Sequence, residues 1–384
     1  MRAPGALLPA RWILVLVALA TPVWAQSNAV RVRLYAVHPP SKVTVSGTGL
    51  AWKSCETCPE KAADKLTVLA AHGQVQLEGG AIPYPKLLVS LSAVGGKPAT
   101  NAYRLSAEGQ QPVSTTYPLE LRAQQDVLVV VLTMPLEDYV SAVLGGESGN
   151  FKNLESMKAM AVAVRTYAAR FRGRHADEGF DYCDTTHCQD LRLAATNLRT
   201  RLAAESTAGE LLWYQGALAT TYYHQHCGGT LASASEVWPT VHAPYLKTHA
   251  DPYCAAAPLH WQTTITRAEL DQALAASQVK LPNGWRTVEV TGRTPSGRAQ
   301  RLRLSGPGGS VDVSASTLRF AVGRELGWSR IRSDLYEIRV SDAGATFTGA
   351  GAGHGVGLCQ AGAEQMAAKG SSYKEILAFY YPGT

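Results

Sequence analysis

The feature that most constrains the fold is a change in hydrophobic periodicity at Pro135. Before it, from Ala29 to about Val131, short runs rich in β-branched residues alternate with Gly, Pro and Ser, as in VRVRLYAV, KVTVSG and DVLVVVLT. Such runs are typical of strands. After it, apolar residues recur at helical spacing in MPLEDYVSAVLGGE and again over 154–171. We therefore predict an α+β fold, in which a β-rich N-terminal region precedes a domain of mixed helix and sheet.

The predicted organisation has three successive segments. They are a signal peptide at 1–25, a β-rich region at 26–127 and a mixed domain at 128–384. Within the last, a β-rich subregion at 262–340 contains a hairpin in TVEVTGRTPSGRAQRLRLSG and a helix at 267–277. The chain has 384 residues, of which 46% are hydrophobic, so it can bury cores of this size.

The N-terminus predicts export. Arg2 and Arg11 flank an apolar run at 12–20, and a small-x-small cleavage signal ends at Ala25. No later apolar run approaches the roughly 20 residues of a membrane helix, so we expect a periplasmic or secreted protein without a transmembrane segment after cleavage. Cleavage lowers the formal net charge from +6 to +4, and the basic residues are scattered. This argues against nucleic acid as a partner and is compatible with a carboxylate-bearing extracellular substrate.

Cysteine usage limits the covalent framework. An odd number of cysteines in an oxidising compartment leaves at least one thiol outside any intramolecular disulfide. No helical pattern follows the Cys55/Cys58 pair, so we predict a local disulfide there rather than a redox or metal motif. The seven cysteines are Cys55, Cys58, Cys183, Cys188, Cys227, Cys254 and Cys359.

Four residues have the composition of a metal site: His175, Cys183, His187 and Cys188. Zinc takes thiolate and imidazole ligands in tetrahedral geometry, and a short loop can supply them. Two alternatives remain open at this point. Cys183 and Cys188 could form a disulfide, and His187 could be a hydrogen-bonding loop residue.

Glu147 is the carboxylate most suited to acid–base chemistry. We predict that Gly145 and Gly146 end the preceding helix, which places Glu147 on a loop at its C-terminus. The negative end of the helix dipole would raise the pKa of the carboxyl, as a general acid requires. The alternative is an ordinary exposed loop glutamate. On the next helix, Lys158 and Arg165 are seven residues apart and project from a shared face.

Two glycine-rich segments carry polar side chains. The stretch HQHCGGT ends a predicted strand, so His224 would point into a cleft at the strand ends, although an isolated histidine has a structural role more often. The run GAGAGHGVGLCQ contains His354 and Gln360, and a helix is expected over 361–369. Glycines let a backbone approach a ligand closely, and the two polar side chains can bind a sugar. The alternatives are a flexible linker, and a Cys359 nucleophile with His354 as its base.

Together these segments resemble the SpoIID/LytB family of bacterial cell-wall proteins. The resemblance runs in order from about residue 128 to the end, through PLEDYVSAVLGGE, ESMKAMAVAVRTYAAR, FDYCDTTHCQ, TTYYHQHCGGTLASASEVW, PYLKTHADPYC, GHGVGLCQAGAEQMAAKG and SYKEILAFYYPGT. Several ordered motifs are far more specific than one short pattern. The chain departs from the family pattern at Cys227, at Ala352-Gly353 and at Cys359.

The resemblance implies a function and a site. The family includes lytic transglycosylases, which cut peptidoglycan glycan strands lacking stem peptides, and modifiers of amidase activity. By this resemblance Glu147 is the acid/base, the CDTTHC loop matches a zinc-binding segment, and the glycine run lines the substrate cleft. Lys158 and Arg165 are then expected to orient Glu147 or meet a substrate carboxylate, and His224, His354 and Gln360 to contact the sugar.

Three functions follow as hypotheses. The first is a lytic transglycosylase acting on MurNAc–GlcNAc bonds, which needs one carboxylate because the 6-hydroxyl of the sugar is the nucleophile, whereas glycosidases use two. The second is a non-catalytic wall-binding enhancer of a cell-wall amidase, with that enzyme as its partner. The third, a zinc hydrolase, needs an open metal position, and the four candidate ligands would close the site.

Overall fold

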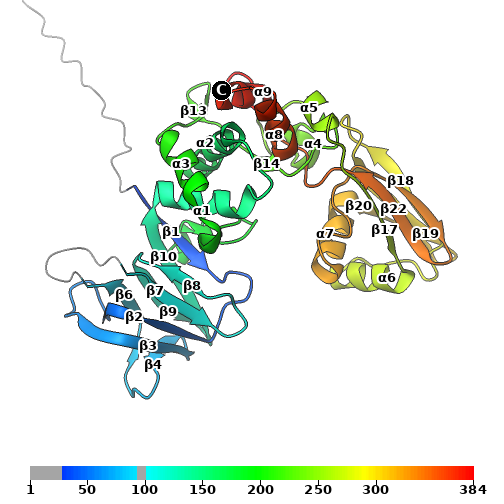
Figure 1. Ribbon diagram of the computed structural model, residues 1–384. Coiled ribbons are helices and arrows are strands. Elements are labelled where there is room, and N and C mark those ends of the chain that lie inside the picture. The colour runs from blue at the N-terminus through cyan, green and yellow to red at the C-terminus, as the bar shows by residue number, and fades with distance from the viewer. Residues whose placement is uncertain (1–27, 93–100) are drawn as a thin grey trace, which may run out of the picture.

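The computed structural model describes residues 28–92 and 101–384, so the predicted signal peptide lies outside the described residues. The fold is α+β, as predicted. Figure 1 shows a β-sheet region, a group of helices beside it, and a second β-rich lobe reached through the loops around α4 and α5. Within the described residues, none of the helices combines the length and apolar character needed to cross a membrane.

The N-terminal region supplies most of an eleven-stranded sheet. Its strands run in the order β11-β1-β10-β9-β6-β2-β3-β4-β5, and β7 pairs with β2 and β8. Among the described strands of this sheet, only β1 and β11 pair in parallel. The strands are β1 Ala29–Leu34, β2 Lys42–Lys53, β3 Lys61–Ala71, β4 Gln74–Leu77, β5 Pro83–Tyr84, β6 Lys86–Leu91, β7 Tyr103–Ala107, β8 Val113–Thr115, β9 Leu119–Gln124, β10 Val127–Pro135 and β11 Tyr182–Cys183. The predicted Cys55–Cys58 disulfide is confirmed.

The helices are continuous with this sheet. Strand β10 passes directly into α1, whose neighbours are α2 and α3, and α2 also contacts α8 and α9. One hydrophobic core extends from the sheet through these helices, so the predicted boundary at 127/128 falls at the start of a shared strand. The helices are α1 Leu136–Glu147, α2 Leu154–Arg170, α3 Leu198–Ser206, α8 Gln360–Ala368 and α9 Tyr373–Tyr380.

The second β-rich lobe has a core of its own. It contains two three-stranded sheets, β17-β22-β21 and β18-β19-β20, with α6 packed against α7 (Figure 1). The predicted hairpin is confirmed as β18 and β19, and the predicted helix as α6. The elements are β17 His260–Ile265, α6 Arg267–Ala276, β18 Thr287–Arg293, β19 Ala299–Gly306, β20 Gly309–Ser314, α7 Ala315–Leu326, β21 Tyr336–Ser341 and β22 Gly344–Ala350.

The remaining elements are short. Strands β14 and β23 pair in parallel with His224 opposite Cys359, which brings the two glycine-rich motifs side by side. The short elements are β12 Trp213–Tyr214, β13 Ala217–Leu218, β14 Tyr223–His224, β15 Thr230–Leu231, α4 Ala234–Val237, β16 His249–Ala250, α5 Pro252–Ala255, β23 Leu358–Cys359 and the 3-10 turns Ala176–Glu178 and Leu193–Ala195.

Candidate functional site

Glu147 is the last residue of α1 rather than a loop residue. The prediction that Gly145 and Gly146 end the helix is wrong, because α1 runs through both. Their role is close packing: a Cβ on Gly146 would clash with the carbonyl oxygen of Asp190, and one on Gly145 would lie 3.0 Å from that of Arg192. Glycines therefore allow the segment after β11 to lie against the end of α1. Glu147 remains at the negative end of the helix.

The carboxyl of Glu147 is half-buried in a polar setting. Burial raises its pKa to about 7, and the neighbouring Asp190 carboxylate adds to the rise. Two hydrogen bonds act in the opposite direction, from the Asp190 backbone N–H to Oε1 at 3.1 Å and from the Tyr223 hydroxyl. A carboxyl with a pKa near 7 is present in both protonation states at neutral pH, which suits a group that donates and then accepts a proton.

A chain of hydrogen bonds fixes the Tyr223 hydroxyl. Gln189 Nε2 donates to the Tyr223 oxygen at 3.1 Å, and the Tyr139 hydroxyl donates to Gln189 Oε1 at 3.0 Å. Tyr223, Gln189 and Asp190 are not among the site residues predicted from the sequence. Their position in the sequence could have indicated them, because each lies next to a predicted site residue or motif. Gln189 and Asp190 follow the last cysteine of the CDTTHC loop, and Tyr223 precedes His224.

The four predicted metal ligands converge. One side-chain ligand atom from each of His175, Cys183, His187 and Cys188 lies within 4.8 Å of the others. Cys183 Sγ is 3.1 Å from Cys188 Sγ and 3.6 Å from His187 Nδ1, and Cys188 Sγ is 3.4 Å from His175 Nε2. Cys183 and Cys188 are free thiols here, and the Cys183 S–H is directed at the Cys188 sulfur. Two sulfurs and two imidazole nitrogens match a closed tetrahedral site, so this cluster could hold a metal ion.

His224 and His354 form a pair that we call the histidine wall. The centroids of their rings are 5.4 Å apart. His224 Nδ1 lies 3.1 Å from the Val356 carbonyl oxygen, and His354 Nδ1 accepts from the Val356 N–H at 3.1 Å. The edge of His354 also meets Trp238 with ring centroids 4.9 Å apart. Burial lowers the pKa of His224 to about 3 and that of His354 well below its usual value. Both imidazoles are neutral at physiological pH.

The glycine run packs against the protein itself. Gly355 and Gly357 have φ of 83° and 71°, and a Cβ on them would collide with the Arg298 guanidinium and the Tyr222 carbonyl oxygen, respectively. The close approach predicted for a ligand is therefore, at these two positions, an approach to neighbouring chain segments. Gln360 begins α8 directly after the run and is 7% exposed.

Lys158 and Arg165 have partners other than Glu147. The Arg165 guanidinium is fully buried and binds Glu137 with contacts of 2.6 to 3.2 Å. It also donates to the Ala204 carbonyl oxygen at 2.9 Å. Lys158 pairs with Glu155 at 2.8 Å. Arg165 is thus unavailable to a substrate in this structure, and its role is to join α2 to α1 and α3.

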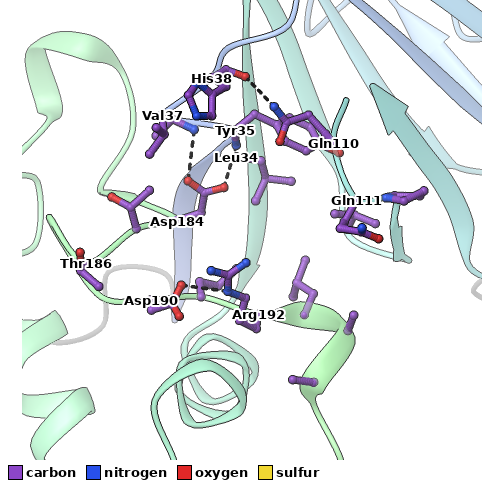
Figure 2. Close-up of a pocket in the computed structure, with 18 residues that line it drawn as sticks. Leu34, Tyr35, Val37, His38, Gln110, Gln111, Asp184, Thr186, Asp190 and Arg192 are labelled. Carbon is purple, nitrogen blue, oxygen red and sulfur yellow. Dashed lines mark hydrogen bonds and ion pairs between the residues drawn. The ribbon is translucent and has the colours of Figure 1, made fainter. Parts of the chain in front are cut away.

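A pocket of about 760 Å³ adjoins the acid site. Figure 2 shows that Asp184 accepts backbone hydrogen bonds and that Asp190 pairs with Arg192. The Tyr35 N–H donates to Asp184 at 2.7 Å, and Arg192 Nε is 3.0 Å from Asp190 Oδ1. Glu147 does not line this pocket, but Asp190 does while its N–H binds Glu147. The pocket and the acid therefore share the segment around Asp190.

The chain matches two family models and several known proteins. A family model described as stage II sporulation protein (SpoIID) matches residues 124–214, and one for a domain of unknown function (DUF8618) matches 255–357. An uncharacterized protein of Brachyspira hyodysenteriae is 34% identical over 260 residues, which cover 67% of this chain and 68% of the relative. Stage II sporulation protein D of Bacillus subtilis is 30% identical over 272 residues, 66% of this chain and 75% of the relative.

A third relative is named for a different role. The amidase enhancer of Bacillus subtilis is 27% identical over 284 residues, which cover 60% of this chain and 38% of that protein. The SpoIID match ends at Tyr214 and includes Glu147 and the whole four-ligand cluster. On the identity and coverage of these relatives, the chain belongs to the SpoIID family, the family of bacterial cell-wall proteins that its motifs resemble.

Proposed function

We propose that this protein is a peptidoglycan lytic transglycosylase with Glu147 as its acid and base. The observation that carries the proposal is a half-buried carboxyl at the end of α1 whose pKa is raised to about 7. In the protonated form, Glu147 donates its proton to the oxygen that links MurNAc C1 to GlcNAc. The C1–O bond then breaks, the MurNAc 6-hydroxyl bonds to C1, and its proton returns to the Glu147 carboxylate. The products are a 1,6-anhydroMurNAc end and a free GlcNAc hydroxyl.

The polar neighbours of Glu147 support this role. The Asp190 N–H and the Tyr223 hydroxyl hold the carboxylate and stabilise it after the proton has left. Asp190 supplies a second carboxylate nearby, which a hydrolytic glycosidase would require. However, its Oδ1 is paired with Arg192 Nε at 3.0 Å. We therefore assign Asp190 a positioning role through its backbone.

Product analysis tests the proposal. Mature protein is incubated with glycan strands stripped of stem peptides, and the products are identified by mass spectrometry. We expect 1,6-anhydro ends, and the same products from Asp190→Asn, because its backbone N–H is kept. Hydrolytic products with reducing ends, lost in Asp190→Asn, would replace the proposal with a two-carboxylate glycosidase.

The alternative function is enhancement of a cell-wall amidase, and it is favoured by the likeness to the amidase enhancer. It requires glycan binding but no proton donor. If the purified protein releases no product from stripped glycan yet accelerates an amidase on intact peptidoglycan, this alternative holds. We also propose that the protein is exported: the proposed substrate lies outside the cytoplasm, so the mature protein is expected to begin near Gln26 in the periplasm or medium.

We further propose that the cluster of His175, Cys183, His187 and Cys188 binds zinc. Four protein ligands leave no open position, so the ion would stabilise the loop that presents Gln189 and Asp190 to the acid. Reduced, metal-free protein should therefore melt at a lower temperature than the zinc-loaded form, as measured by calorimetry. A native Cys183–Cys188 disulfide would contradict this assignment.

A further inference from the structure

A second group of metal-ligand side chains lies apart from the first, at the junction of three segments. Cys227 follows β14, Asp251 and Cys254 lie at the start of α5, and Cys359 ends β23 and precedes α8. One ligand atom from each of the four residues lies within 4.8 Å of the others, and all four residues are buried. Three of the five free cysteines of the described chain are in this group.

The contacts within the group orient its ligand atoms toward one another. Cys227 Sγ is 3.4 Å from Asp251 Oδ2, and the Cys227 N–H donates to Cys359 Sγ at 3.2 Å. Asp251 uses its other oxygen, Oδ1, to cap α5, accepting from the Cys254 N–H at 2.9 Å. The Tyr380 hydroxyl donates to Oδ2 at 2.9 Å. The carboxylate is thus held in place by neighbours that leave Oδ2 facing the sulfurs.

A buried carboxylate among three thiols is stable in its charged form only beside a compensating positive charge. The nearby Arg298 guanidinium is directed to backbone oxygens, with Nη2 donating to the Cys227 carbonyl at 2.7 Å and Nη1 to that of Thr230 at 3.1 Å. A disulfide would join two sulfurs and leave the third thiol beside the carboxylate. A divalent cation would use all four groups and offset their charge.

His226 does not complete the set in place of Asp251. Its Nδ1 lies 3.2 Å from Cys254 Sγ and also accepts from the Gly228 N–H at 3.0 Å, and its Nε2 is 2.8 Å from the Ala257 carbonyl oxygen. Because a backbone N–H can only donate, Nδ1 is the acceptor and Nε2 carries the proton. Both ring nitrogens therefore have backbone partners.

We propose that Cys227, Asp251, Cys254 and Cys359 bind a second zinc ion. Zinc accepts thiolate and carboxylate ligands in a four-coordinate site, whereas Cu(I) selects soft sulfur ligands alone. With four protein ligands the site is closed and structural. It ties the end of β14 to the start of α8, and so fixes the glycine run beside His224 and Gln360. The inference does not depend on the proposed enzymatic activity.

Metal counting tests the second site. Mature protein, residues 26–384, is purified from the exported fraction without chelators, and bound zinc is measured by elemental mass spectrometry. We expect about two zinc ions per chain, falling to about one in Cys183→Ser/Cys188→Ser, which removes only the first cluster. The proposal would be overturned if the double variant folds but contains no zinc. It would also be overturned if the native wild-type protein has a disulfide among Cys227, Cys254 and Cys359.

A second measurement needs no variant. The wild-type protein is treated with iodoacetamide before and after zinc removal by a chelator, and each cysteine peptide is assigned by mass spectrometry. We expect alkylation of Cys227, Cys254 and Cys359 to rise at least about tenfold once the ion is removed, because the segments that bury these thiols lose the ion that ties them together. Labelling that requires a reductant contradicts a metal site.

Discussion

Burial has opposite effects on the pKa values of the acid site and of the histidine wall. It raises the pKa of the Glu147 carboxyl, whereas it lowers the pKa values of the His224 and His354 imidazoles. The two regions meet at β14, where Tyr223 binds the carboxyl and His224 belongs to the histidine wall. In both, removal from water disfavours the charged form. The result differs because a neutral carboxyl holds a proton that it can donate near pH 7, while these neutral imidazoles titrate far below that pH. Proton transfer is therefore expected from the acid end alone, and positioning from the histidine wall.

The largest effect is expected on activity, when the carboxyl of Glu147 is replaced. Glu147→Gln keeps the size of the side chain and an acceptor for the Asp190 N–H, but it cannot donate the proton. We expect the rate of 1,6-anhydro product release to fall at least about a hundredfold, the lower end for loss of general acid catalysis. Binding of stripped glycan should persist. A Gln variant with a near wild-type rate would move the acid role elsewhere and favour the amidase-enhancer alternative.

The same substitution should raise the stability of the protein at alkaline pH, although it lowers the activity. The folded-state pKa of Glu147 is about 7 and the unfolded value about 4.3, so the folded state binds more protons between these pH values. The free energy of unfolding contributed by this group therefore falls as pH rises from about 4 to about 7. Glu147→Gln should be more stable than wild type at pH 8 by on the order of 1–3 kcal/mol, and the gain should shrink toward pH 4. Urea unfolding at the two pH values measures it, and equal differences would contradict a raised pKa.

A smaller effect is expected at the histidine wall. His354→Asn can still accept a hydrogen bond from the Val356 N–H while removing the imidazole. Loss of one neutral contact to the sugar is worth about 0.5–1.5 kcal/mol, so kcat/KM should fall about threefold to tenfold. The pH dependence of the remaining activity should be unchanged. A shift of that dependence would show that the imidazole takes part in proton transfer.

The sequence predicted elements that depend on local pattern. The strands before Pro135, helix α6, the β18–β19 hairpin and the Cys55–Cys58 disulfide each follow from periodicity or spacing, and each is present. The convergence of His175 with the CDTTHC loop was also predictable, because all four ligands lie within 14 residues of chain.

The remaining features depend on contacts between distant segments. Local pattern predicts a helix stop at Gly146, but the Asp190 carbonyl that requires a glycine there comes from another part of the chain. The sequence predicts that Arg165 orients Glu147 or meets a substrate carboxylate, because helical spacing says nothing of Glu137 on α1, which binds Arg165 of α2. The second cysteine cluster likewise needs β14, α5 and β23 to meet, and no spacing rule brings them together.

The pH dependence of kcat/KM on stripped glycan tests most directly whether Glu147 is the proton donor. Because the donor must be protonated in the free enzyme, the value should fall on the alkaline side with an apparent pKa near 7, approaching a tenfold loss for each further pH unit. Asp190→Asn removes the neighbouring negative charge and should move this limb toward lower pH. A kcat/KM that stays constant from pH 5 to pH 9 would contradict the assignment of Glu147 as the acid.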